Sequence, residues 1–88
     1  MAERRVTIVN ELGLHARAAA KFVKLAQGFS ANVKVAKDGQ QVSGSSILGL
    51  MMLAAGPGDE IAISAEGEDA DDALNALATL VADGFNED

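Results

Sequence analysis

The sequence of 88 residues contains no cysteine, tryptophan or tyrosine, and it has one histidine and one proline. The lack of cysteine excludes disulfide bonds, thiol catalysis and cysteine-based zinc or iron–sulfur sites. A single histidine cannot form a cluster of imidazole ligands, and there is no Gly-x-x-x-x-Gly-Lys nucleotide loop. We therefore expect no metal, no cofactor and no kinase activity of the chain's own. The 3 phenylalanines are the only aromatic residues, so few platforms exist for stacking nucleic-acid bases.

Long apolar segments are absent as well. No run reaches the about 20 apolar residues that a membrane span needs, and the first residues lack the apolar core of a secretory signal peptide. The composition, 49% hydrophobic and 23% charged, is that of a globular chain and not of a disordered one. We expect one domain over residues 1–88, located in the cytoplasm, with neither a membrane nor a nucleic acid as partner.

The net charge of −6 is unevenly distributed along the chain. Residues 1–37 contain all seven basic and only two acidic residues, which gives +5. Residues 38–88 contain eleven acidic residues and no basic one, which gives −11. Nucleic-acid-binding proteins usually have a larger basic excess. A locally basic half on an acidic protein instead suits an acidic protein surface or a small anion.

The hydrophobic pattern predicts seven elements in the order β-α-β-β-α-β-α. Strands are expected at residues 5–9, 33–35, 40–43 and 60–65, and helices at 16–27, 47–53 and 70–83. Asp38-Gly39 predicts a two-residue hairpin turn, Gly28 and Gly84 are expected to end helices, and Asp69 is a candidate N-cap. A strand is the alternative for the short run 47–53. This order predicts an α+β fold with helices on one face of a largely antiparallel sheet.

His15 lies where the first loop becomes a helix. The first backbone N–H groups of a helix have no internal partner, and the helix dipole adds positive charge there. Arg17 in the first turn supplies a guanidinium suited to phosphate oxygens. A phosphoryl group on His15 would therefore have both donors and counter-charge, and the positive field should keep the imidazole neutral and nucleophilic. The alternative is a solvent-facing histidine that only caps the helix.

Arg17, Lys21 and Lys24 are spaced to form a basic stripe along one face of this helix. A solvated polar face is one interpretation, and a docking strip for an acidic partner is the other. Residues 47–53 hold Ile47, Leu48 and Met51 among six large apolar side chains, more than a two-turn helix can bury. Some should face water and form a partner site. Ser45 and Ser46 before this helix are N-cap candidates or phosphorylation sites.

Together, two segments resemble the HPr family, the small histidine-containing phosphocarriers of the bacterial phosphoenolpyruvate-dependent phosphotransferase system. Residues 13–17 (Gly-Leu-His-Ala-Arg) are similar to the family's active-site motif, and residues 46–51 (Ser-Ile-Leu-Gly-Leu-Met) to its second motif. The distance between the two motifs, the chain length and the element order agree as well, so the resemblance covers the whole chain.

The resemblance implies an open-faced sandwich, a four-stranded antiparallel sheet covered on one face by three helices. It implies that His15 accepts a phosphoryl group on Nδ1 from phosphorylated enzyme I and passes it to a histidine of an enzyme IIA domain, assisted by Arg17. Ser46 would be modified by HPr kinase/phosphorylase. The shared docking surface would comprise Lys21, Lys24, Ile47, Leu48 and Met51. Such a protein is a carrier rather than an enzyme, and we expect a monomer.

Two positions depart from the family pattern. Ala18 stands where the family usually has proline, which could loosen the pocket, because proline pre-sets the first helical turn. Ser45 stands where the family often has lysine, so either Ser45 or Ser46 could be modified. The Ala18 context and the acidic C-terminal half also fit a regulatory, nitrogen-type branch. Two other hypotheses stay open: an interaction module switched by Ser46 phosphorylation, and a ligand-binding domain for a free anion.

Overall fold

The computed structural model describes residues 2–87, and its elements follow the predicted order. The strands are β1 (Ala2–Thr7), β2 (Asn32–Lys37), β3 (Gln40–Ser43) and β4 (Glu60–Glu66). The helices are α1 (Ala16–Ala26), α2 (Ile47–Met52) and α3 (Ala70–Ala82), and a short 3-10 turn, η1 (Gly84–Asn86), follows α3. The helix predicted at 47–53 is confirmed, and the strand given as the alternative for these residues is wrong. The turn η1 was not predicted.

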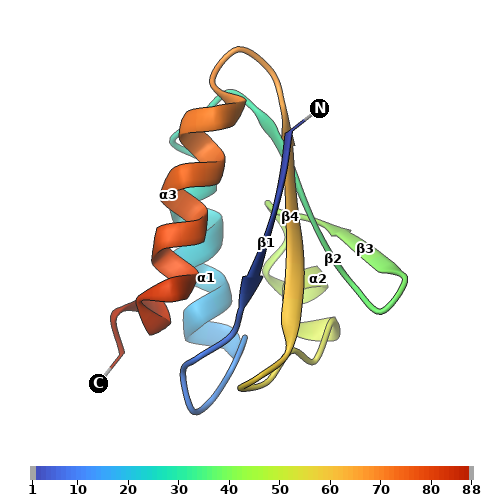
Figure 1. The fold of residues 1–88 in the computed structure, drawn as a ribbon, viewed down its shortest axis with the longest axis vertical. Coiled ribbons are helices and arrows are strands. Elements are labelled where there is room, and N and C mark those ends of the chain that lie inside the picture. The colour runs from blue at the N-terminus through green and yellow to red at the C-terminus, as the bar shows by residue number, and fades with distance from the viewer. Residues whose placement is uncertain (1, 88) are drawn as a thin grey trace.

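The four strands form one sheet in the order β1-β4-β2-β3, and every neighbouring pair is antiparallel. The Asp38-Gly39 turn joins β2 to β3 with positive φ at both residues, 50° and 84°, as a tight hairpin requires. The helices cover one face of this sheet, and the opposite face stays open (Figure 1). The expected open-faced sandwich is therefore confirmed.

The end of β1 differs from the prediction. β-branched residues continue through Val9, but the ladder with β4 ends where Thr7 lies opposite Glu60. Ile8 is fully buried and bonds to the turn that precedes β4. Its backbone N–H donates to Asp59 O at 2.8 Å, and its carbonyl oxygen accepts from Gly58 N at 2.8 Å. The expected strand 5–9 is therefore wrong at its end, because β4 offers no partner beyond Glu60.

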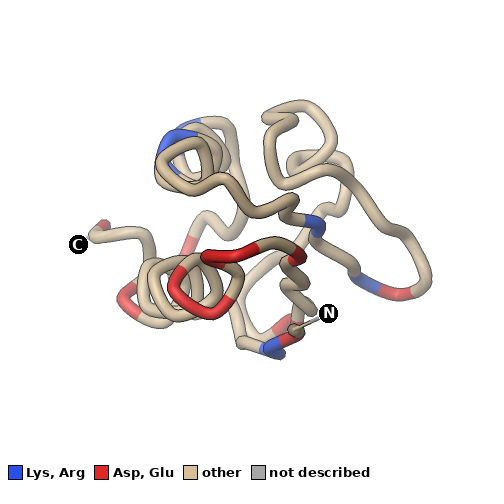
Figure 2. Tube along the Cα trace, turned by 90° about the horizontal axis from the view of Figure 1, so that it is seen from above, with Lys and Arg blue, Asp and Glu red and all other residues tan. Residues whose placement is uncertain are grey.

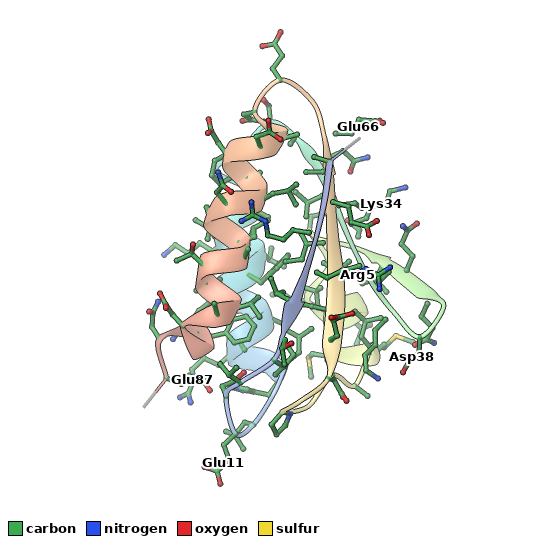
Figure 3. The ribbon with its side chains drawn as sticks, viewed as in Figure 1. Arg5, Glu11, Lys34, Asp38, Glu66 and Glu87 are labelled. Carbon is green, nitrogen blue, oxygen red and sulfur yellow. The ribbon has the colours of Figure 1, made fainter. Side chains whose placement is uncertain are left out.

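The two faces of the sheet differ in the way that strand alternation predicts. Ile61 and Ile63 of β4 point toward the helices and are buried. The largest fully buried side chains of the core are Phe22, Phe85, Ile8, Leu50, Ile61, Ile63, Leu77, Val35 and Val81. On the open face, Arg5, Lys34 and Glu66 project away from the helices (Figure 3). This charged face is not hydrophobic enough to require a second layer.

Helices α1 and α3 lie side by side and run in opposite directions, so α1 begins where α3 ends (Figure 1). Basic residues lie on α1, and acidic residues gather at the start of α3 (Figure 2). None of the helices within residues 2–87 has the length and apolar character that a membrane crossing requires. The antiparallel pairing has a direct consequence for the site, because the chain leaving α3 arrives at the start of α1.

Asp69 occupies the predicted N-cap position of α3, but its side chain does not cap that helix. Its carboxylate instead accepts hydrogen bonds from the backbone N–H groups of Ser30 and Ala31, each at 2.8 Å. The capping role expected of the Asp69 side chain is thus wrong. Its oxygens find backbone donors in the segment that follows α1, which the sequence places 38 and 39 residues away. Gly84 ends α3 with φ 66°, as predicted.

Candidate functional site

His15 is the N-cap residue of α1, with extended backbone angles (φ −80°, ψ −179°) and no side-chain capping bond. Its carbonyl oxygen accepts the first helical hydrogen bond, from Ala19 N at 2.8 Å. The imidazole is 24% exposed, so it is partly sheltered and still reachable. Because no side-chain cap is made from the N-cap position, the positive end of α1 stays available to a negative group at His15.

The loop that delivers His15 is fixed by backbone contacts. Gly13 has φ 64°, and a Cβ atom there would lie 2.3 Å from Ala55 O, so a side chain cannot be accommodated without movement. Leu14 N donates to the same Ala55 O at 2.9 Å. The Asn10 side chain donates to Gly13 O at 2.8 Å from a buried position. These contacts explain why glycine precedes the histidine by two residues.

A carboxylate that the sequence reading did not predict reaches His15 from the end of the chain. Glu87 Oε2 lies 2.5 Å from His15 Nε2, and Glu87 Oε1 accepts from Asn10 Nδ2 at 3.1 Å. Arg17 Nε lies 3.7 Å from the same Oε2. Figure 3 shows Glu87 beyond the end of α3, whereas Glu11 extends from the loop at the tip of the molecule. The site therefore joins three side chains near the start of α1 with one from the chain end.

The tail that carries Glu87 adopts an unusual backbone. Gly84, Phe85 and Asn86 have φ values of 66°, 58° and 60°. These values lie in the left-handed region, which residues other than glycine rarely adopt. Phe85 compensates for this strain because its ring is fully buried in the core. Lys21 Nζ adds a hydrogen bond to Phe85 O at 2.7 Å. The apolar Phe85 directly after the predicted helix stop was the sequence signal for this tail.

The surroundings of Glu87 favour its ionised form. Partial burial, with 12% of the side chain exposed, acts to raise the pKa of this carboxyl. The hydrogen bonds from His15 and Asn10 and the charges of His15 and Arg17 act in the opposite direction and leave the Glu87 pKa below its usual value. The carboxylate is thus present as an anion beside the imidazole at neutral pH.

The predicted basic stripe is partly engaged by the same tail. Lys21 is held by Phe85 O and Arg17 lies near Glu87, although the Arg17 side chain is 67% exposed. Lys24 is exposed. A hollow of about 490 Å³ adjoins this region and is lined by Val9, Asn10, Glu11, Leu12, Arg17, Lys21, Asn86 and Glu87. The stripe therefore has one end inside the site and one end free for contact.

Helix α2 shows how the two serines differ. Ser46 Oγ accepts from Gly49 N at 2.9 Å, which makes Ser46 the N-cap of α2. Ser45 is exposed, and its hydroxyl pairs with that of Ser43 at 2.8 Å. The N-cap role suggested for a serine is confirmed for Ser46. Whether either hydroxyl is modified stays a prediction.

Helix α2 also exposes the apolar surface that its composition predicts. The exposed fractions of Ile47, Leu48 and Met51 are 41%, 68% and 40%. Leu50 of the same helix is fully buried, and α2 packs against α1. Ala18, which stands where proline is usual in the family that the sequence resembles, is fully buried as the third residue of α1. Within residues 2–87 no group of acidic or histidine side chains forms a metal site.

Comparison with known proteins gives one consistent result. The sequence model of the family described as "PTS HPr component phosphorylation site" matches residues 2–83. The phosphocarrier protein HPr of Cupriavidus necator is 47% identical to this chain over 87 residues, which cover 99% of the chain and 98% of that protein. The phosphocarrier protein NPr of Shewanella violacea is also 47% identical, with 97% of this chain and 93% of that protein covered.

A solved structure has the same fold as this chain. The crystal structure of HPr-C-His from Thermoanaerobacter tengcongensis superposes with a TM-score of 0.95 at 42% identity. The match covers 100% of this chain and 99% of the other. The likeness therefore extends over all helices and strands and includes the segments that carry His15 and Ser46.

Proposed function

Because the chain belongs to the HPr family of phosphocarriers of the phosphotransferase system, we propose that His15 accepts a phosphoryl group from phosphorylated enzyme I and passes it to a histidine of an enzyme IIA domain. The observation that carries this proposal is the position of the only histidine. It stands at the uncapped start of α1, partly exposed, with Arg17 beside it.

Arg17 stabilises the phosphoryl group in this proposal. Its guanidinium is two residues from His15, is 67% exposed and approaches the Glu87 carboxylate at 3.7 Å. A guanidinium that already faces a carboxylate oxygen can bind phosphate oxygens in the same way. The backbone N–H groups of the first turn of α1 supply further donors.

The docking surface is proposed to combine Lys24 and Lys21 of α1 with Ile47, Leu48 and Met51 of α2. The two helices pack against one another, which places a basic surface beside an exposed apolar one. Such a combination suits a partner with an apolar patch and an acidic rim. The chain then acts as a reactant that is loaded and unloaded, while enzyme I and enzyme IIA provide the catalysis.

Ser46 is the residue we propose for regulatory phosphorylation by HPr kinase/phosphorylase. Its oxygen already points to the N-terminus of α2, where a phosphate is electrostatically acceptable. The added charge would lie beside Ile47 and Leu48 and would repel an acidic partner. Ser45 is the alternative, since its hydroxyl is exposed and only paired with Ser43.

The branch of the phosphotransferase system served by the chain is a separate question. Relatives named HPr and NPr share the same 47% identity with it, so identity favours neither. A regulatory module that signals by binding and by Ser46 phosphorylation, with little role in sugar transport, is the second candidate. The exposed apolar surface of α2 favours it, because that surface can serve binding without transfer.

Mass spectrometry after incubation with enzyme I, magnesium and phosphoenolpyruvate tests the proposal. We expect an adduct of one phosphoryl group that mild acid removes, and no adduct on His15→Ala. An acid-stable adduct, or an adduct that persists in His15→Ala, would contradict the carrier role of His15. Absence of any adduct with a demonstrably active enzyme I would leave the regulatory module as the better account.

A further inference from the structure

The Glu87 carboxylate forms a defined contact with one nitrogen of the His15 ring. Oε2 lies 2.5 Å from Nε2, while the other carboxylate oxygen is held by Asn10 Nδ2 at 3.1 Å. Both oxygens are thus engaged, and the carboxylate group cannot rotate freely. Asn10 is itself fixed by its bond to Gly13 O at 2.8 Å. The result is a chain of hydrogen bonds from the loop through Glu87 to the imidazole.

The tail that presents Glu87 is held in place independently of this contact. Phe85 is fully buried, and Lys21 Nζ binds its carbonyl oxygen at 2.7 Å. Phe85 and Asn86 adopt positive φ values of 58° and 60°, which a free chain end would avoid. Burial of the Phe85 ring therefore fixes the unfavourable backbone conformation of Phe85 and Asn86, and this conformation places the Glu87 side chain beside His15.

From this geometry we infer that Glu87 is a positioning residue for phosphoryl transfer: it holds the proton of His15 on Nε2 and thereby presents Nδ1 as the nucleophile. A carboxylate accepts hydrogen bonds only, so its contact with Nε2 requires a proton on that nitrogen. A neutral imidazole with a proton on Nε2 has its lone pair on Nδ1. The inference rests on the proposed function, because it concerns the same transfer.

The step balances without any further reactant. The Nδ1 lone pair forms the new N–P bond while the bond between phosphorus and the donor breaks, and its electron pair stays with the donor. The Nε2 proton remains in place, so the loaded ring carries positive charge next to the Glu87 carboxylate. The carboxylate then opposes that charge, in the way that the buried aspartate of a serine-protease triad orients and stabilises its histidine.

Two substitutions separate the hydrogen bond from the charge. Glu87→Ala removes both, whereas Glu87→Gln keeps an oxygen acceptor and removes only the charge. Glu11→Gln is the matched control, since Glu11 lines the same hollow, is exposed and has no described bond to His15. The first readout is the Nε2–H proton resonance of unphosphorylated His15, which is visible only while a hydrogen bond slows its exchange with water. The second is the single-turnover rate of phosphoryl transfer from enzyme I.

We expect Glu87→Ala to lose the Nε2–H resonance and to accept the phosphoryl group about tenfold more slowly, as for loss of one charge-assisted hydrogen bond. Glu87→Gln should keep the resonance and accept the phosphoryl group at a rate between those of the wild-type protein and Glu87→Ala. A wild-type rate in Glu87→Ala would overturn the inference, and so would an equal slowing in Glu11→Gln. A faster rate would overturn it as well and would identify Glu87 as a competitor of the phosphoryl group.

The two readouts also distinguish this inference from the function on which it rests. The proton resonance needs no phosphoryl donor, so it tests the contact between Glu87 and His15 directly. If the wild-type protein shows the resonance and takes no phosphoryl group, the proposed function fails and the positioning role fails with it. If the wild-type protein is loaded on His15 but lacks the resonance, only the positioning role fails.

Discussion

The two ends of α1 are each contacted by a carboxylate that belongs to α3 or to the chain after it, and the two contacts differ in kind. Beyond the end of α1, Asp69 at the N-cap position of α3 accepts from the backbone N–H groups of Ser30 and Ala31, each at 2.8 Å. At the start of α1, Glu87 contacts the imidazole of His15 and the amide of Asn10. Asp69 thus binds two backbone N–H groups and, at 3.3 Å, the Ser30 hydroxyl, whereas Glu87 binds side chains only.

This difference separates a structural contact from a chemical one. Backbone N–H groups and the Ser30 hydroxyl keep the same charge at neutral pH, so Asp69 only holds the segment after α1 against α3. In the proposed function the His15 imidazole gains and loses a phosphoryl group, so Glu87 contacts a group whose charge changes. The antiparallel arrangement of α1 and α3 makes both contacts possible from one helix (Figure 1).

The charges at the two helix starts differ in the same sense. The first turn of α3 contains Asp71 and Asp72, which neutralise its positive end. The first turn of α1 contains no acidic residue, and Arg17 lies within it. Figure 2 shows the resulting separation, with basic residues on α1 and acidic residues at the start of α3. Of these two helix starts, that of α1 is therefore the one prepared for a further anion.

Replacement of the tail anchor should give the largest effect. Phe85→Ala removes a fully buried ring, and we expect it to lower the free energy of unfolding by about 3–5 kcal/mol. It should also release the tail, so the Nε2–H resonance of His15 should weaken at temperatures where the variant is still folded. Urea unfolding with a parallel NMR spectrum measures both. A stable variant with an unchanged resonance would show that the tail does not depend on Phe85.

Loss of the guanidinium at the start of α1 should come next. Arg17→Ala removes the charge-assisted contact that we propose for the phosphoryl group, and we expect transfer from enzyme I to slow by about 10–100-fold with little change in the free energy of unfolding. Lys34→Ala, on the open face of the sheet, is the control and should leave the rate unchanged (Figure 3). Equal slowing in both variants would point to overall charge rather than to Arg17.

At the other contact, Asp69→Asn should reduce stability in a pH-dependent way. The hydrogen bonds from Ser30 N and Ala31 N lower the Asp69 pKa below its ordinary value of 3.8. Its stabilising contribution is therefore fully present above about pH 4–5 and is lost as the pH falls through the lowered pKa. Wild type should be more stable than the variant at pH 7, and the gap should narrow toward pH 3.

Urea unfolding of both proteins at the two pH values measures this gap. Asp71→Asn, in the same first turn but exposed, is the matched control and should show a smaller difference. A gap that widens on acidification would reverse the sign and contradict the assignment of Asp69 as the carboxylate that holds the segment after α1.

The smallest effect is expected at the start of α2. Ser46→Ala removes the N-cap bond to Gly49 N, which should lower the free energy of unfolding by about 1 kcal/mol. Ser45→Ala should change stability less, because the Ser45 hydroxyl is exposed and pairs only with Ser43. Thermal unfolding compares the two variants. A larger loss in Ser45→Ala would mean that the capping role had been assigned to the wrong serine.

Much of the fold could be predicted from local signals. The alternation of Val33 and Val35, the Asp38-Gly39 turn and the apolar spacing of α1 each report on residues near one another in the chain. The position of β1 beside β4 could not be predicted in this way, because that pairing joins residues about 60 positions apart. The predicted end of β1 was wrong for the same reason, because it depends on where β4 begins at Glu60.

The candidate site was predicted only in its local part. His15 and Arg17 stand two residues apart in one motif, so their proximity follows from the sequence. The contact of His15 with Glu87 spans 72 residues and depends on a left-handed turn and on the burial of Phe85. The apolar Phe85 after the helix stop at Gly84 was the available signal, and it predicts an anchored tail but not where the tail ends.

The most direct test of the account compares the two helix starts in one spectrum. Backbone amide resonances would be recorded by two-dimensional NMR before and after loading with a phosphoryl group from enzyme I. We expect the largest changes at residues 16–18 of α1 and none at residues 70–72 of α3, where acidic side chains already occupy the helix end. Changes of equal size at both starts, or changes absent from α1, would contradict the claim that the start of α1, and not that of α3, is prepared to receive the group.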